Sequence, residues 1–230
     1  MQFLRQLEPF NNVTATGRAV CSSKLVLGNV VERIVLELGG TTFTKAMITA
    51  IRVRLNGKVV FGDVSGTHLD LIQRYLNLVN DTARLTIDFT EPVARNVQGE
   101  LMGGIDTVAS GISDFTIEVD ISGATAPTLA GYVQMRTSES LAGAGFTPAT
   151  RPVIRALVPT SIPVTASGEI QASVNIGSAG ESLIKRLFIA SSILTGFRVK
   201  RDSVDVFGSN ALASGIVGFI AQEYGRQINA

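Results

Sequence analysis

Apolar and polar residues alternate along much of the first 140 residues, which is the pattern of half-buried β-strands. The clearest run is Phe115-Thr116-Ile117-Glu118-Val119-Asp120-Ile121. Similar patterns predict strands over Arg18–Leu27, Val31–Leu38, Ile48–Leu55, Lys58–Phe61, Arg84–Phe89, Asp114–Ile121 and Leu129–Arg136. An eighth strand is expected within Val97–Ala109. The pattern therefore predicts a mainly β unit.

One hairpin can be predicted in detail. Asn56-Gly57 stands between two β-rich runs, and these two residue types tolerate the positive φ angles of a two-residue turn. Ile51, Val53 and Leu55 should then share one face of the hairpin, with Arg52 and Arg54 on the other.

A helix is expected directly after this hairpin, over Thr67–Asn80. Thr67 is the predicted N-cap, with Asp70 three residues later. One apolar stripe at helical spacing would be formed by Leu69, Ile72, Leu76 and Val79.

The hairpin sequence returns later in the chain. Residues 48–62 (ITAIRVRLNGKVVFG) match residues 194–208 (LTGFRVKRDSVDVFG) at six of fifteen positions, at a constant spacing of 146 residues. VTATG at 13–17 is likewise followed by VTASG at 164–168. Such a period predicts two tandem β units, with domains at 1–140 and 164–230 and a Pro/Gly-rich connector at 141–163.

The second unit is expected to lack its last strands. At this spacing, the counterparts of Arg84–Phe89, Asp114–Ile121 and Leu129–Arg136 would lie beyond Ala230. We therefore expect the natural product to extend about 40–60 residues further.

Composition narrows the function classes. Charged residues make up 17% of the chain and hydrophobic residues 45%, which favours a subunit of an obligate assembly. A net charge of +1 gives no basic excess, so sequence-specific nucleic-acid binding is not expected. Met1–Phe10 does not resemble a signal peptide, and no apolar run is long enough for a spanning helix.

Residues that could carry chemistry are few. The single cysteine, Cys21, and the single histidine, His68, could form a nucleophile pair only if folding joined them. One cysteine and one histidine also exclude an internal disulfide and a zinc site built from such residues. Ser182 and Lys185 fit an S-x-x-K pattern without its companion motifs, and a structural role is the better interpretation.

Three further patterns could carry chemistry or modification. Glu118 and Asp120 share one strand face at a spacing that can serve glycosidases, although a solvated face explains them as well. Gly99, Gly103 and Gly104 lack the pattern of a phosphate-binding loop. The Asn-X-Ser/Thr sequons begin at Asn12 and Asn80. The sequence thus predicts no catalytic, cofactor-binding or metal-binding residue and no enzymatic activity.

The chain resembles the major capsid proteins of corticovirus-type bacteriophages, a double jelly-roll family. The resemblance lies in TTFTKAMITAIRVRLNGKVVFG, HLDLIQRYLN and ARLTIDFTEP, between Glu32 and Pro92. It continues more loosely in the segment beginning FRVKRDSVDVFG. It implies an all-β chain of two eight-stranded jelly rolls, each with a short helix, at Thr67–Asn80 and near Asn210–Gly225.

The resemblance also implies a function. Three subunits would form a capsomer of pseudo-hexagonal outline, which contacts neighbouring capsomers and other capsid proteins in an icosahedral shell around a lipid membrane. The protein would reside in the virion after assembly in the host cytoplasm. Two alternatives remain: a carbohydrate- or receptor-binding β-sandwich such as a viral spike or fibre, disfavoured by the lack of Trp, and a cupin-like enzyme, disfavoured by the single histidine.

Overall fold

The computed structural model describes residues 2–24, 29–76, 78, 81–91, 103–107, 111–137, 157, 161–163, 167–171, 173, 188–189, 197–201 and 204–209. The chain divides into a first unit, Met1–Leu71 with Asn80–Glu169, and a second unit, Ile72–Val79 with Ile170–Ala230. The elements are β1 (Gln2–Gln6), β2 (Gly17–Lys24), β3 (Asn29–Thr42), the 3-10 helix η1 (Lys45–Met47), β4 (Ile48–Leu55), β5 (Lys58–Val64), α1 (Gly66–Tyr75), β6 (Arg84–Asp88), β7 (Ile105–Asp106), β8 (Asp114–Ile121), β9 (Thr125–Thr137), β10 (Phe197–Arg201) and β11 (Val204–Ser209).

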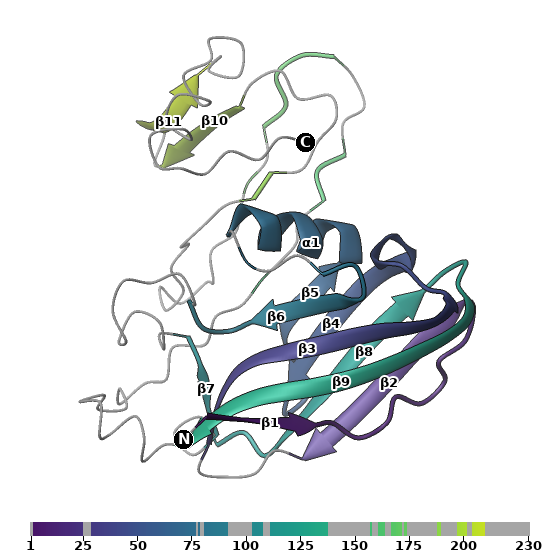
Figure 1. The fold of residues 1–230 in the computed structure, drawn as a ribbon. Coiled ribbons are helices and arrows are strands. Elements are labelled where there is room, and N and C mark those ends of the chain that lie inside the picture. Colours follow the sequence, from purple (N-terminus) through teal and green to yellow (C-terminus); the bar gives the residue numbers. More distant parts are fainter. Residues whose placement is uncertain are drawn as a thin grey trace. The chain divides into compact units, whose positions relative to one another are not determined.

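The first unit is a sandwich of two antiparallel sheets (Figure 1). One sheet has the order β1-β9-β3-β6, with β7 added to the start of β3, and the other has the order β2-β8-β4-β5. Apart from the β4–β5 hairpin and the short β7, consecutive strands alternate between the sheets, which is the topology of a jelly roll. The expected all-β fold is confirmed.

The core lies between the two sheets and is built by the alternation seen in the sequence. Along β8, the inward residues Phe115, Ile117, Val119 and Ile121 are at most 2% exposed, while the residues between them are half-buried on the other face. The opposite sheet contributes side chains such as Leu85, Ile87 and Met135. Burial of each large apolar side chain contributes about 1.5–3 kcal/mol, so the core between the two sheets is the main source of folding stability.

The predicted hairpin is present, and the matching hairpin of the second unit pairs in the same way near its turn, although β4–β5 has a further register shift between Ile51 and Val53. Asn56 (φ 44°) and Gly57 (φ 80°) form the turn between β4 and β5. At the spacing of 146 residues, three consecutive cross-strand pairs of the two hairpins coincide: Val53–Phe61 with Val199–Phe207, Arg54–Val59 with Lys200–Asp205, and Leu55–Lys58 with Arg201–Val204. Both hairpins therefore carry a bulge of one extra residue at the same place, Val60 and Val206.

Helix α1 begins earlier than predicted because Ser65, not Thr67, is its N-cap. The Ser65 Oγ accepts a hydrogen bond from the His68 backbone N–H at 3.2 Å, and the Ser65 carbonyl accepts one from the Leu69 N–H at 3.0 Å. The helix also ends earlier, at Tyr75. Leu69 and Leu76 are buried as predicted, whereas Ile72 is only half-buried.

Helix α1 packs tightly against η1. Lys45 of η1 forms an ion pair with Asp70 of α1, and both side chains are nearly buried. Gly66 lies so close to η1 that a Cβ atom there would be 2.3 Å from the Lys45 carbonyl oxygen. A side chain at position 66 would therefore force the two elements apart.

The strand expected within Val97–Ala109 is present, but it is short: β7 has only two residues. The strand that completes the first sheet is instead β1, which the sequence pattern did not indicate. β1 was missed because an edge strand buries few side chains and so shows little alternation.

Some predictions fall on the connector and the second unit. Leu157, within the predicted connector, forms a parallel bridge with Phe61 at the outer edge of β5. The second helix near Asn210–Gly225 lies outside the described residues, as do Ser182 and Lys185. Of the helices that the structure describes, none is long and apolar enough to cross a membrane.

Candidate functional site

The two residues that could have formed a nucleophile pair lie in different environments. Cys21 is fully buried in β2, where its Sγ donates a hydrogen bond to the Glu8 carbonyl oxygen at 3.0 Å. Burial is the main cause that raises the pKa of the Cys21 thiol, so the nucleophilic thiolate is disfavoured. His68 is exposed in the first turn of α1. The fold does not bring them together.

The sequon at Asn12 and part of the glycine-rich segment lie in the part of the chain that the structure describes. Asn12 has a positive φ of 60°, and its Nδ2 donates to the Arg18 carbonyl oxygen at 2.9 Å. Gly103 and Gly104 lead into β7, while Gly99 and Asn80 lie outside the described residues. Among the described residues, no group of three or more His, Cys, Asp or Glu side chains could hold a metal ion.

Glu118 and Asp120 do share the outer face of β8, but arginines from both neighbouring strands pair with them. Arg18 of β2 binds Asp120 through two bonds, Nε–Oδ1 at 2.6 Å and Nη2–Oδ2 at 3.1 Å. From β4, Arg52 Nη1 contacts Asp120 Oδ2 at 2.9 Å and Arg54 Nε contacts Glu118 Oε1 at 3.0 Å. Together with Asp63, which pairs with Arg52, these six residues form what we call the charged ladder.

The charged ladder contains three arginines and three carboxylates, and this pairing affects the acidity of its carboxyl groups. The hydrogen bond from Arg18 is the main cause that lowers the pKa of Asp120, and Arg52 adds to it. A glycosidase pair needs one carboxyl group with a raised pKa to act as the acid. The pKa of Asp120 is shifted in the opposite direction, and Glu118 is also paired with an arginine, so the ladder is suited to joining the four strands β2, β8, β4 and β5 rather than to acid catalysis.

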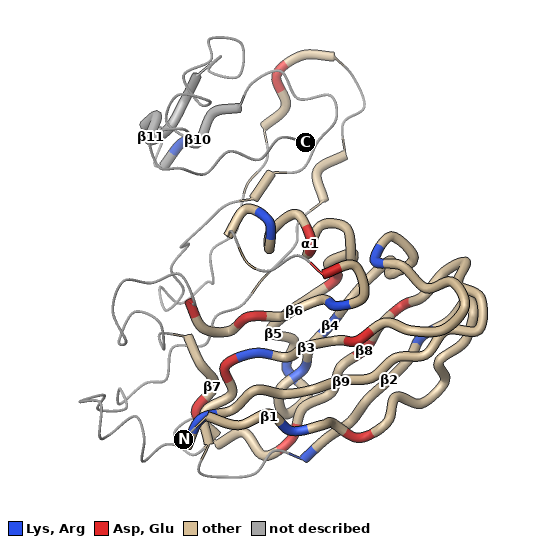
Figure 2. The backbone as a smooth tube through the Cα atoms, viewed as in Figure 1, with Lys and Arg blue, Asp and Glu red and all other residues tan. Residues whose placement is uncertain are grey.

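Part of the ladder could have been found in the sequence. Arg52 and Arg54 alternate with apolar residues on one strand, and Glu118 and Asp120 do so on another. Figure 2 shows basic and acidic residues interspersed along the strands of this unit. Strands with complementary alternation are natural neighbours in a sheet. The pairing of Arg18 with Asp120 could not be predicted in this way, because the two residues are 102 positions apart in the sequence and meet only when β2 and β8 pair in one register.

On the outer face of the sheet β1-β9-β3-β6, one buried carboxylate accepts hydrogen bonds from several side chains. Glu32 stands at a bulge of β3, and its side chain is 4% exposed. It accepts hydrogen bonds from Arg136 Nε at 2.6 Å, Gln134 Nε2 at 3.0 Å and Gln2 Nε2 at 2.5 Å. Glu32 thereby ties β1 and β9 to β3, and no sequence motif announced it.

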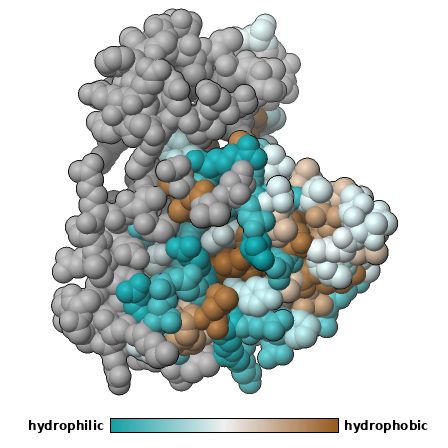
Figure 3. Space-filling view, viewed as in Figure 1, coloured by the Kyte–Doolittle hydropathy of each residue, from teal (hydrophilic) through white to brown (hydrophobic). Residues whose placement is uncertain are grey.

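The described surface offers broad faces rather than a chemical centre. In the view of Figure 3, hydrophilic residues surround separate smaller hydrophobic areas. Two sheet edges are closed by backbone hydrogen bonds: Asn11 pairs with Val20 on β2 at 2.9 and 3.0 Å, and Leu157 bonds to Val60 and Gly62 on β5, each at 3.1 Å.

The fold is similar to that of two solved structures. The chain resembles the crystal structure of the major capsid protein P2 from Bacteriophage PM2, with 25% identity and a TM-score of 0.51, over 60% of this chain and 51% of that one. It also matches the crystal structure of the STIV MCP, with 12% identity and a TM-score of 0.41, over 66% of this chain and 54% of that one. The match thus spans about half the length of each of these proteins. No curated protein sequence matches the chain.

A family model gives the most specific result. The model of the viral coat protein P2 N-terminal domain matches residues 4–136, which is more than half of the chain. These residues include all but the first two positions of β1 and continue almost to the end of β9, so the match covers the sandwich described above. The chain belongs to the family of the viral coat protein P2 N-terminal domain.

Proposed function

We propose that this chain is a major capsid protein, a structural subunit of a bacteriophage coat without enzymatic activity. The observation that carries the proposal is the family match over residues 4–136, which coincides with the jelly-roll sandwich. The likeness to the major capsid protein of Bacteriophage PM2 supports it. The separation of Cys21 from His68 and the balanced charged ladder are consistent with a structural role.

The proposal includes a second jelly roll. The domains would be residues 1–140 and 164–230, joined by the connector at 141–163. The support is that the three pairs nearest the turn and the bulge among them coincide in the β4–β5 and β10–β11 hairpins, an agreement that is less expected from chance than similarity of sequence alone.

In its assembled form the protein would be a homotrimer of pseudo-hexagonal outline. Two jelly rolls in each of three subunits provide six similar units around one axis, which suits tiling with neighbouring capsomers in an icosahedral shell. The low charge content supports large subunit interfaces. We further propose that the shell encloses a membrane and that subunits assemble in the host cytoplasm before residing in the virion.

Native mass and imaging test this function. The purified chain should have the mass of three subunits by light scattering and a hexagonal outline in negative-stain images. Purified virions should contain the protein in the shell, and lipid extraction of these virions tests for the membrane. A protein that stays monomeric at all concentrations and is absent from virions would contradict the proposal.

A further inference from the structure

β1 is an edge strand whose outer side is open in the described part of the chain. It pairs only with β9 and lies at the margin of its sheet (Figure 1). The edges of β2 and β5 are capped by Asn11 and Leu157, but no described residue bonds to the outer backbone of β1. The strand also lacks proline and a bulge, which are common protections of such an edge.

The hydrogen-bonding groups of that open side can be assigned. The Leu7 N–H donates to the Gly131 carbonyl oxygen at 2.9 Å, which continues the β1–β9 ladder. Because bonded and non-bonded pairs alternate along an antiparallel ladder, Phe3 and Arg5 bond to β9. Gln2, Leu4 and Gln6 therefore direct their N–H and C=O groups away from the sheet.

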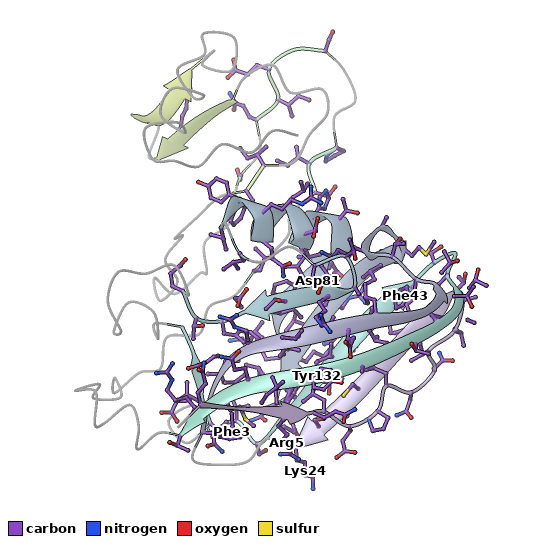
Figure 4. The ribbon with its side chains drawn as sticks, viewed as in Figure 1. Phe3, Arg5, Lys24, Phe43, Asp81 and Tyr132 are labelled. Carbon is purple, nitrogen blue, oxygen red and sulfur yellow. The ribbon has the colours of Figure 1, made fainter. Side chains whose placement is uncertain are left out.

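The sequence of β1, Gln-Phe-Leu-Arg-Gln, is complementary to itself when read antiparallel about Leu4. Such a pairing would place Leu4 opposite Leu4, Gln2 opposite Gln6, and Phe3 opposite Arg5. Like charges would not face each other, and Arg5 has no ion-pair partner among the described residues. Figure 4 shows Phe3 and Arg5 on this outermost strand.

We propose that β1 binds β1 of a second copy of this chain, antiparallel and centred on Leu4. Leu4, which is 61% exposed in the isolated chain, would then contact its own symmetry mate. The outward groups of Gln2, Leu4 and Gln6 would form backbone hydrogen bonds across a two-fold axis, and Arg5 would lie over the Phe3 ring of the other copy. The two sheets would become one continuous sheet.

A five-residue strand pair is small, below the roughly 1,000 Å² of a stable interface, so two isolated copies should associate weakly. Repetition over many copies would strengthen it through effective concentration. In this respect the inference rests on the proposed coat function, where the contact would join capsomers related by a two-fold axis.

Disulfide trapping tests the register. In the proposed pair the two Leu4 Cα atoms are about 5.5 Å apart, within the range that a disulfide bridges. Leu4→Cys should give a covalent dimer of the full chain under mild oxidation. The matched control Gln6→Cys places its two Cα atoms about 13 Å apart along the strands and should form no disulfide-linked dimer. The parent chain controls for Cys21, which is buried.

A second variant tests the backbone bonds. Leu4→Pro removes an N–H that points outward and none that bonds to β9, so it should preserve the circular dichroism spectrum and weaken self-association in sedimentation experiments at least tenfold. Leu4→Ala, which keeps the N–H, should weaken it less. Failure of Leu4→Cys to cross-link, equal cross-linking of Gln6→Cys, or unchanged association of Leu4→Pro would each overturn the inference.

These results separate the inference from the proposed function. Hexagonal particles that form without Leu4→Cys cross-links would leave the coat function standing and remove the β1 pairing. Specific cross-links in a protein that forms no capsomers and is absent from virions would do the reverse.

Discussion

Replacing Gly66 with alanine should destabilise the protein, although the same change inside a helix ordinarily stabilises it. Alanine is favoured over glycine by about 1 kcal/mol in a helix because it loses less backbone entropy. At this position, however, the new Cβ would lie 2.3 Å from the Lys45 carbonyl oxygen and 3.1 Å from the Ile48 Cβ.

Neither of these neighbours can move cheaply. The segment from η1 into β4 is held by the Met47 N–H bond to the Thr44 carbonyl oxygen at 3.0 Å and by the Ser122 N–H bond to the Met47 carbonyl oxygen at 2.9 Å. The helix must therefore shift by about 1 Å, which loosens the Lys45–Asp70 ion pair. Overpacking of this kind costs about 1–3 kcal/mol, and contacts with backbone atoms lie at the upper end of this range, so the net loss after the helical gain should be up to about 2 kcal/mol.

Urea unfolding of the full chain, followed by circular dichroism, measures this effect. The matched control is Thr67→Ala at the next, exposed position, where the helical preference acts alone and the free energy of unfolding should rise by up to about 0.5 kcal/mol. A Gly66→Ala protein as stable as the parent, with α1 intact by amide hydrogen exchange, would refute the close packing of α1 on η1.

Three further substitutions test other contacts. The pKa of Asp120 is lowered mainly by Arg18, so its carboxylate stabilises the fold above the unfolded pKa of about 3.9 and loses this effect as the pH falls through the folded pKa. Arg18→Met should therefore reduce the loss of stability on acidification, measured by acid titrations followed by circular dichroism. Glu32→Ala should lower the free energy of unfolding by about 3 kcal/mol in urea, because it removes a buried partner of Arg136, and Glu32→Gln by less. Cys21→Ser should leave capsomer formation in negative-stain images unchanged and cost under about 1.5 kcal/mol in stability.

Local chemistry explains which elements could be predicted from the sequence. Asn56-Gly57 defined its turn because few residue types accept positive φ angles, and β8 was correct at both ends because one of its faces is buried along its whole length. The start of α1 was misplaced because Ser65 and Thr67 are both good caps, and packing of Gly66 against η1 decides between them.

The ladder and the Glu32 contacts depend on information that local patterns do not hold. Arg18 meets Asp120, and Glu32 meets Arg136, only after strands more than 100 residues apart have paired in one register. β1 illustrates a different limit: its strand is defined by its bonds to β9 rather than by burial of its own side chains.

The bulge that the two hairpins have in common limits the length changes that each can accept. A bulge bends its strand and increases the local twist, so deleting Val60 or Val206 would leave the neighbouring pairs in place but straighten the hairpin. Single-residue insertions and deletions within either hairpin should therefore be eliminated by selection, whereas substitutions that keep its length are tolerated. Strand length, more than residue identity, is then the heritable property to follow when related coat proteins are aligned.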